Sequence, residues 1–309
     1  MATKYPFTIT PELTAISIAY RNKAMIADTV LPRVPVGSRS FKYMTYPIGE
    51  SFTVPDTKVG RKSKPNQVEF SATEQTASVD DYGLDDPIPN DDIAAAPANY
   101  DPKGNAIMGI TNLIELDREV RTAGLVFNAN NYAAANKIVL SGSSQFSDPT
   151  SDPIKTIMDA LDAMVMRPNI MTIGRAAFSA LIRHPKIVKA VLGNAGDSGI
   201  ARREDIAALF ELEAIAVGES FVNTARKGQT VAMQRVWGKH ISLLYRDQLA
   251  NTQSGTTFGF TAQFGDRLGM EREDGDIGLR GGIVVRAGES VKELITAPDL
   301  GYFIQNVIA

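Results

Sequence analysis

Residues 112–140, NLIELDREVRTAGLVFNANNYAAANKIVL, form the longest stretch of helical periodicity in this sequence. Apolar and small side chains recur there at spacings of three and four residues, from Leu113 to Ile138, which places them on one face of a helix. Asn112 is a suitable N-cap and Gly142 a suitable stop. The pattern predicts one helix of about 43 Å, at about 1.5 Å per residue. We expect a long strut against which other elements pack.

The composition is that of an ordinary globular protein. The chain has 309 residues, enough for about two domains, and is 44% hydrophobic and 22% charged. With 32 Lys and Arg against 35 Asp and Glu, bulk charge does not favour nucleic acid. The absence of cysteine excludes disulfides, thiolate metal sites and cysteine nucleophiles. Neither a signal peptide nor an apolar run of membrane-spanning length is visible, so we expect synthesis in the cytoplasm and no membrane partner.

The N-terminal segment is basic and rich in helix breakers. Within residues 1–42, Lys and Arg outnumber Glu12 and Asp28, and four prolines interrupt the chain. A short amphipathic stretch at 12–30 is compatible with a small helix. We therefore predict an extended basic arm, with a segment packed on its own domain as the alternative.

Residues 36–80 predict a long β-hairpin. Aromatic and β-branched residues cluster at 41–46, 51–54 and 68–71, which is typical of strands. Between the last two clusters, residues 58–66 combine four basic side chains with glycine and proline, which indicates a turn at the tip of the hairpin. The hairpin has few apolar residues for its length, and an isolated hairpin is marginally stable. We expect it to lie against another surface.

The charge reverses in the next segment, residues 80–92. It contains Asp80, Asp81, Asp85, Asp86, Asp91 and Asp92. Adjacent carboxylates repel one another, so the run needs water or a basic partner. A solvated loop and an acidic patch that meets the basic hairpin tip of a neighbouring chain are both compatible with it. A calcium site is disfavoured, because the spacing is not that of a calcium-binding loop.

From residue 151 onward, helices and strands alternate and then give way to strands. Asp152 followed by Pro153 is a helix start, and the His184-Pro185 pair breaks a later helix. We predict helices over 153–166, 175–192 and 203–211, and strands over 170–173, 213–222, 230–237, 240–246, 256–264, 280–286, 289–295 and 301–308. This order of elements predicts an α+β fold.

The sequence offers little catalytic chemistry. The only histidines, His184 and His240, do not have the spacing of metal ligands, and no nucleophile elbow or phosphate-binding loop occurs. The glycine-rich segment 278–282 lies between predicted strands and indicates a turn or bulge. We predict no enzyme, and no catalytic, metal-binding or cofactor-binding residues. A hydrolase with an α/β lobe and a tail-tube subunit are weaker alternatives.

This order of segments resembles the major capsid proteins of tailed bacteriophages, whose fold is named after phage Hong Kong 97. The ending GGIVVRAG at 281–288, through APDLGYF at 297–303, looks like the closing strands of that family. The stretch ANYDPKGNAIMGITNLIELDREVRTAGLVFNANNY at 98–132 is similar to capsid proteins of transposable Mu-like phages. The resemblance implies an N-terminal arm at 1–35, an E-loop with flanking strands at 36–82, a P-domain at 83–150 with spine helix 112–140, an A-domain at 151–238, and a β-rich segment at 239–309 that closes the P-domain and returns its last strand to the A-domain.

The function implied by the resemblance is assembly. Subunits would form hexamers and pentamers of an icosahedral head shell around double-stranded DNA, located in the virion after assembly in the host cytoplasm. Implied partners are the protein itself, portal and scaffold proteins, a decoration or minor capsid protein, and packaged DNA through non-specific interior contacts. An encapsulin-type nanocompartment shell, with the same fold, is the alternative.

Charge patterning supplies the candidate site. We predict inter-subunit contacts between the basic tip and the acidic run. The residues are Lys58, Arg61, Lys62 and Lys64 on the tip, and Asp80, Asp81, Asp85 and Asp86 on the acidic run. Each exposed ion pair contributes only about 0.2–1 kcal/mol, so such pairs set register more than affinity.

Overall fold

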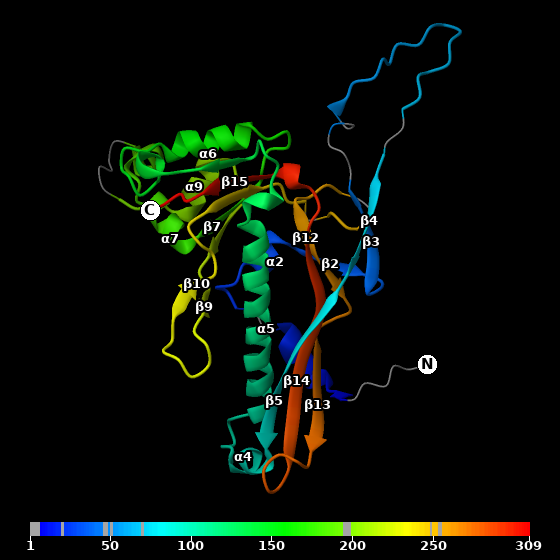
Figure 1. Ribbon diagram of the computed structural model, residues 1–309, viewed down its shortest axis with the longest axis vertical. Coiled ribbons are helices and arrows are strands. Elements are labelled where there is room, and N and C mark those ends of the chain that lie inside the picture. The colour runs from blue at the N-terminus through cyan, green and yellow to red at the C-terminus, as the bar shows by residue number, and fades with distance from the viewer. Residues whose placement is uncertain are drawn as a thin grey trace.

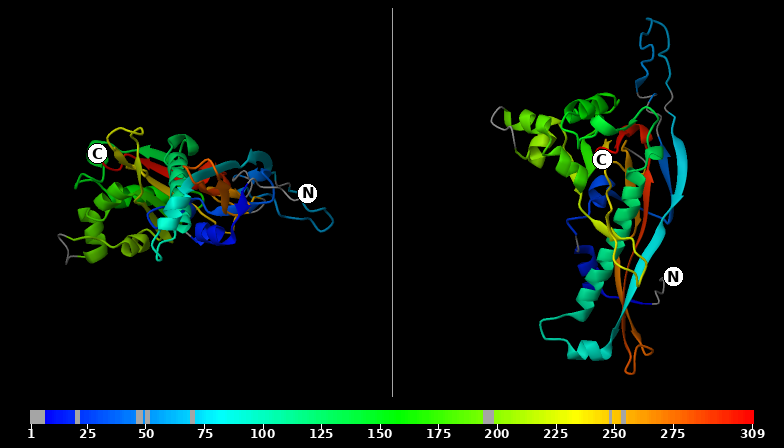
Figure 2. Two further views of the ribbon diagram at one scale, coloured as in Figure 1. Left: turned by 90° about the horizontal axis from the view of Figure 1, so that it is seen from below. Right: turned by 60° about the vertical axis from the view of Figure 1, so that its left-hand side comes forward.

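Two main β-sheets and one long helix organise the molecule (Figure 1). A mixed lobe lies at one end, a narrow sheet runs along the helix, and a hairpin projects from the body (Figures 1 and 2). The computed structural model describes residues 7–19, 22–45, 49, 52–68, 71–193, 199–247, 249–252 and 255–309.

The long helix, α5, spans Pro102–Val126. The prediction of a helix over 112–140 is therefore wrong at both ends. The helix begins at Pro102 because the Asp101 side chain caps it by accepting a hydrogen bond from the Lys103 backbone N–H, and proline is well suited to the first helical position. It ends before an asparagine-rich turn that contains the 3₁₀ helix η1 (Ala129–Asn131), because asparagine side chains bond to nearby backbone and favour turns.

A six-stranded sheet lies along α5. Its central strand is β14, which replaces the two strands predicted at 280–286 and 289–295 by one continuous strand. The sequence pattern also gave no sign of β13. The strands are β1 (Thr8–Ile9), β13 (Leu268–Asp274), β14 (Gly282–Ile295), β12 (Gly259–Phe264) and β2 (Arg33–Val36), with β5 (Asp80–Pro89) on the opposite side of β14.

The N-terminal segment packs on this sheet and helix. Helix α1 (Pro11–Ala19) contacts β13 and α5, and α2 (Ala27–Val30) contacts α5. Leu13 is buried in the cluster formed by α5 and β14. The extended arm predicted for 1–35 is therefore wrong where the structure describes this segment, and the alternative of a segment packed on its own domain is correct there. Residues 1–6 lie outside the described residues.

The predicted hairpin is present in shorter form. Strand β3 (Ser40–Thr45) pairs antiparallel with β4 (Thr73–Ser78), with Ser40 opposite Ser78 and Thr45 opposite Thr73. Residues 52–68 carry no strand and form a loop that extends away from the body (Figure 1). The strands predicted at 51–54 and 68–71 are therefore wrong where they are described. Residues 46, 51 and 69–70 of the predicted strands are outside the described part.

The lobe contains a five-stranded sheet flanked by helices. Asp152 caps the helix that begins at Pro153, as the Asp-Pro pair predicted. The break predicted at His184-Pro185 is also present, and His184 caps the helix that begins at Pro185. The sheet is β6 (Lys137–Val139), β15 (Gly301–Gln305), β11 (Ile241–Leu244), β7 (Ile170–Gly174) and β8 (Ala214–Gly218), with helices α6 (Pro153–Asp162), α7 (Arg175–Leu181), α8 (Pro185–Leu192) and α9 (Arg203–Leu209). Three of these strands, β6, β11 and β15, lie outside the predicted boundaries 151–238 of this lobe, and of these only the return of the last strand, β15, was predicted.

Shorter elements connect these parts. Strands β9 (Phe221–Asn223) and β10 (Met233–Arg235) form a second, two-stranded ribbon beside the lobe. The remaining elements are α4 (Asn90–Ala95), the 3₁₀ helices η2 (Gly142–Ser144) and η4 (Pro298–Leu300), and the turn at 275–281 between β13 and β14. The turn confirms the prediction for the glycine-rich segment 278–282.

Candidate assembly surfaces

A buried carboxylate on α5 joins three parts of the chain. Glu119 has no exposed surface, and it accepts hydrogen bonds from the backbone N–H groups of Ile26 and Ala27 at 2.8–3.0 Å. It also accepts one from Trp237 Nε1 at 2.5 Å and one from Ser220 Oγ at 3.3 Å. Burial raises the pKa of Glu119, although all four donors favour the charged form. The carboxylate holds the N-terminal segment, α5 and the lobe in one arrangement.

Next to it, a network of buried ion pairs crosses from α5 to the sheet. The Arg118 guanidinium is buried, lies 2.6 Å from Asp28 Oδ1 and donates to Thr261 Oγ1 at 3.2 Å. On β14, the Glu289 carboxylate contacts Arg33 at 2.8 Å and Arg267 at 3.0 Å. Burial acts to raise the pKa of Glu289, but the two guanidinium groups outweigh it and lower the pKa overall.

These charges neutralise one another within the chain. Removing one partner of a buried pair leaves an uncompensated charge and is strongly destabilising. We therefore assign this region, the "junction" (Asp28, Arg33, Arg118, Glu119, Arg267 and Glu289), to the stability of the subunit rather than to binding.

Both histidines hold the lobe together. His184 accepts the Lys186 backbone N–H at 3.3 Å as the cap of α8, and its Nε2 lies 3.1 Å from Ser151 Oγ. His240 Nδ1 accepts the Asn306 backbone N–H at 3.0 Å. Burial lowers the pKa of both rings. Among the described residues, no group of three or more His, Asp or Glu side chains is arranged to hold a metal ion.

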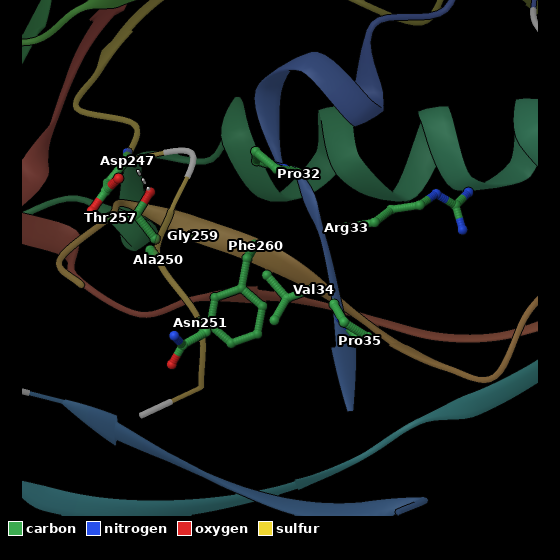
Figure 3. A pocket seen from close by; sticks show the side chains of 10 residues that line it. All are labelled: Pro32, Arg33, Val34, Pro35, Asp247, Ala250, Asn251, Thr257, Gly259 and Phe260. Atoms are coloured by element: carbon green, nitrogen blue, oxygen red, sulfur yellow. Dashed lines mark hydrogen bonds between the residues drawn. The ribbon is translucent and has the colours of Figure 1, made fainter. Parts of the chain in front are cut away.

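Figure 3 shows a pocket of about 160 Å³ between β2, β12 and the segment that follows β11. Val34 and Phe260 face into it, and Asp247, Asn251 and Thr257 add polar groups to its walls. The Arg33 side chain points away from the other lining residues (Figure 3) because it reaches Asp28 and Glu289. Arg33 is thus already used by the junction, and Asp247 accepts a hydrogen bond from the Leu249 backbone N–H at 2.9 Å, so both charged side chains of the pocket have partners within the chain.

The basic residues of the hairpin loop are fully available. Lys58, Arg61, Lys62 and Lys64, here called the basic tip, are exposed and form no ion pair with the described residues. Apolar side chains of the same loop are exposed as well: Phe52 is 58% and Val54 89% exposed. Val59 and Val68 are also exposed. The loop therefore presents apolar and cationic groups that no described residue of its own chain covers.

The acidic run is a strand rather than a solvated loop. It forms β5 with β14 as its neighbour, and three of its carboxylates find cations in the same chain: Asp85 with Arg286 at 2.5 Å, Asp80 with Lys292 at 2.9 Å, and Asp81 with Arg39. The Arg39 hydrogen bond lowers the pKa of Asp81. After the strand, Asp91 pairs with Arg280 at 3.0 Å. The need for a basic partner is correct, but these partners are intramolecular.

The position of β5 explains its unusual composition. Asn90, which follows the strand, donates its backbone N–H to Gly281 on the β14 side. Successive residues of a strand point their backbone N–H groups to opposite sides, so the odd-numbered residues of β5 point theirs to the free edge. Pro87 and Pro89 stand at such positions and have no N–H group. Charged side chains and prolines are the usual protection of an edge strand against unwanted pairing.

Within one chain, the structure does not bring the two predicted halves of the site together. The loop with the basic tip extends beyond the lobe end of the molecule, whereas β5 runs toward α4 at the other end (Figures 1 and 2). No ion pair joins the basic tip to Asp80, Asp81, Asp85 or Asp86 among the described residues. Contact between them requires a second copy. Asp86 and Asp92 form no ion pair with the described residues.

The comparisons with known proteins agree with this architecture. A family model described as phage major capsid protein E matches residues 106–262, about half of the chain. The major capsid protein of Pseudomonas phage JBD67 is 59% identical over 304 residues, which cover 98% of each chain. This chain belongs to the family of phage major capsid proteins. The major capsid protein of Burkholderia phage BcepMu is 29% identical over 97% of this chain and 96% of its own, in agreement with the Mu-like resemblance.

Solved structures confirm the capsid fold. A phage-related protein from Bordetella bronchiseptica superimposes with a TM-score of 0.77 at 24% identity, covering 98% of this chain and 99% of its own. The capsid protein of cyanophage P-SCSP1u superimposes with a TM-score of 0.59 at 11% identity, covering 99% of this chain and 91% of its own. The predicted α+β capsid fold is confirmed. Within the described part of this capsid protein, no helix is long and apolar enough to cross a membrane.

The sequence of this capsid protein predicted one exposed feature only in part. The ribbon of β9 and β10 exposes Phe221, Val231 and Met233, and the guanidinium of Arg235 stacks 4.5 Å from the Phe221 ring. Its strands have only three residues each, which is too short for a reliable pattern. The strand predicted over 230–237 contains β10, and the end of the strand predicted over 213–222 overlaps β9, but the pairing of the two appeared only in the structure.

Proposed function

We propose that this capsid protein forms hexamers and pentamers of an icosahedral phage head that encloses double-stranded DNA. The observation that carries the proposal is the hairpin loop 52–68, whose apolar and basic side chains are exposed and not covered by the described residues of their own chain. A long ribbon of this kind is marginally stable by itself. A neighbouring subunit in a closed shell supplies the missing surface.

Apolar burial supplies the affinity in this proposal. Covering a Val or Phe side chain completely contributes about 1.5–3 kcal/mol, and Phe52 and Val54 are both largely exposed in the single subunit. The basic tip adds register and orientation, because exposed ion pairs are weak. A shell repeats this contact many times, so a modest energy per contact is sufficient for closure.

The role is structural rather than catalytic. The charged groups at the centre of the subunit, at Arg118 and Glu119, are buried and used within the chain. We further propose portal and scaffold proteins as assembly partners in the host cytoplasm, a decoration or minor capsid protein on the shell, and non-specific contact with packaged DNA inside it. The curated relatives are capsid proteins of phages, which favours this shell over an encapsulin-type compartment.

Electron microscopy of the full-length protein tests the proposal. The protein is expressed alone and together with the neighbouring genes of its phage, and the products are sized and imaged by negative stain. Closed shells or rings of six are expected, and nucleic acid in the shells made with the phage genes separates a phage head from a nanocompartment. A monomer or dimer under all of these conditions would contradict the proposal.

A further inference from the structure

The hairpin formed by β9 and β10 projects from the lobe. It points toward the α4 end of the molecule, away from the hairpin loop 52–68 (Figures 1 and 2). All residues from Arg226 to Arg235 are exposed, so the connecting loop and β10 present both faces to solvent. Two strands without further cover are marginally stable. We call residues 221–239 the basic ribbon, for the charges described next.

The ribbon carries cations without matching carboxylates. No Asp or Glu occurs between Glu219 and Asp247, whereas five Lys and Arg residues do. Glu219 itself pairs with Arg175 at 3.1 Å, and the last of the five cations, Arg246, is half-buried. The other four are exposed and form no ion pair with described residues: Arg226, Lys227, Arg235 and Lys239. They are uncompensated in a chain whose net charge is −3.

The local sequence fixes two of these cations at the apex of the ribbon. The Arg226 carbonyl oxygen accepts a hydrogen bond from the Gln229 backbone N–H at 3.0 Å, which closes a four-residue turn. Gly228, the third residue, has a φ of 87°, as a type II turn requires at that position. Asn223 Oδ1 accepts two further backbone N–H groups at 3.0 and 3.1 Å. The turn therefore presents Arg226 and Lys227 on a defined frame.

The strands place a third cation on one face of the ribbon. The register sets Arg235 opposite Phe221 and Met233 opposite Asn223, and residues paired in this way share a face. The Arg235 guanidinium lies 4.5 Å from the centre of the Phe221 ring, a contact that holds the charge on this face. Met233 is exposed on the same face. Cationic and apolar groups thus lie side by side there.

These features fit the backbone of a nucleic acid. Lys and Arg side chains bind phosphates irrespective of base sequence. The major groove of double-stranded DNA admits a two-stranded ribbon, and apolar side chains contact thymine methyl groups there. Interfaces between proteins are instead depleted in lysine, and two of the four free cations of the ribbon are lysines.

We propose that the basic ribbon binds the phosphate backbone of the packaged double-stranded DNA, and that the side of the lobe that carries it faces the interior of the shell. This inference rests on the proposed function and names the surface that meets the DNA. A subunit repeated over a whole shell meets DNA of every sequence, so contacts to phosphate suit it better than contacts to particular bases.

Lysine labelling of intact particles tests the proposal. Filled heads and heads that have released their DNA are treated with a small acylating reagent, and the modification of each lysine is measured by mass spectrometry. Lys227 and Lys239 should react about fivefold or more slowly in filled heads, because bound phosphates cover their amines. Lys189, exposed on α8 without an ion pair to a described residue, is the control and should react equally in both.

The outcomes separate DNA from a protein partner. If Lys227 and Lys239 react rapidly in both kinds of head, they have no DNA contact and the inference is overturned. If they react slowly in both, another protein surface covers the ribbon, and the inference is equally overturned. An absence of shells from the wild type would instead contradict the proposed function.

A second measurement needs no shells. Binding of the unassembled full-length subunit to a fluorescent double-stranded DNA of mixed sequence is followed by anisotropy at several salt concentrations. R226Q with K227Q should lower the slope of log affinity against log salt by about 1.8, at about 0.9 per phosphate contact. K189Q with R202Q removes the same charge at exposed positions of the lobe and should leave the slope unchanged. Equal slopes for the wild type and the ribbon variant, or an equal loss in the control, would contradict the inference.

Discussion

The junction around Glu119 and the hairpin loop 52–68 are opposites in one chain. At the junction, charged groups are buried and every donor around Glu119 has its acceptor. On the loop, cations and large apolar side chains are exposed and uncovered. The subunit itself completes the junction, whereas under the proposed function a neighbouring subunit completes the loop.

The contrast also divides the acidic residues. Those on β5 that face Arg286 and Lys292 belong with the junction, because their partners lie within the chain. Asp86 and Asp92 are exposed and have no such partner among the described residues. The same residue type thus stabilises the fold at one position and, a few residues away, is exposed without an ion pair to a described residue.

The largest effect on folding is expected at the junction. Glu119→Ala leaves the N–H groups of Ile26 and Ala27, the Ser220 hydroxyl and the Trp237 indole without their acceptor. A buried donor without a partner costs about 1–3 kcal/mol, so we expect the free energy of unfolding to fall by about 3 kcal/mol or more. Urea unfolding of the unassembled subunit measures this.

Asp117→Ala is the matched control on the same helix. Its side chain is 58% exposed and pairs only with Arg121 one turn away, so a loss of about 0.3–0.5 kcal/mol is expected. Equal unfolding free energies for the two variants would show that the junction does not hold the subunit together.

The loop should give the converse result. Phe52→Ser with Val54→Ser removes exposed apolar groups, so the free energy of unfolding should stay within about 0.5 kcal/mol of the wild type. The yield of shells should fall about tenfold or more, because burial of these side chains between subunits is lost. Leu279→Ser, at a side chain that is 98% exposed on the β13–β14 turn, serves as the control. A destabilised subunit, or normal shell assembly, would remove the distinction between loop and junction.

Acid should weaken the junction through Glu289. Its pKa is lowered from an ordinary 4.5 in the folded subunit, so its stabilising effect is complete above pH 4.5 and is lost as the pH falls through the folded value. Glu119 acts in the opposite sense because its pKa is raised. As the pH falls through this raised pKa, protonation of Glu119 stabilises the folded subunit, and the gain is complete near the ordinary pKa of 4.5. We expect a shallower loss of stability below pH 4.5 in Glu289→Gln than in the wild type, measured by urea unfolding. If the free energy of unfolding fell with pH at the same rate in both proteins, the assignment of Glu289 to the junction would be contradicted.

The smallest effect is expected on the paired part of β5. Asp85→Asn breaks a half-exposed ion pair with Arg286 and should cost about 0.2–1 kcal/mol. Because Asp85 has its partner in the same chain, shell yield should be unchanged when counted by negative stain. A strong assembly defect in a folded Asp85→Asn subunit would place Asp85 at the subunit interface after all.

Some of this architecture was predictable from short-range signals. Asp152-Pro153 and His184-Pro185 mark helix starts that the structure contains. The identical Asp101-Pro102 pair marks the start of α5, but the apolar periodicity favoured a helix start at residue 112. Helix continuation past Val126 was predicted from spacing alone, and the asparagines that end the helix outweigh that spacing.

The candidate site depended on long-range contacts that a sequence does not display. Aspartate and proline are depleted in strands, so β5 resembled a loop until pairing with β14 supplied Arg286 and Lys292. Glu119 looks like any polar residue on a helix, and its donors come from residues that are about a hundred positions away. The basic tip, by contrast, was predictable from the sequence alone, because its four cations lie close together in one short segment.

Hydrogen exchange of the free subunit and of the assembled shell tests the central claim most directly. The account predicts that amides in the loop 52–68 exchange at least about tenfold more slowly in the shell, because assembly covers a segment that is open in the subunit. The amides of Ile26 and Ala27, which donate to Glu119, should be protected in both states. Loop amides that exchange equally fast in closed shells would contradict the account.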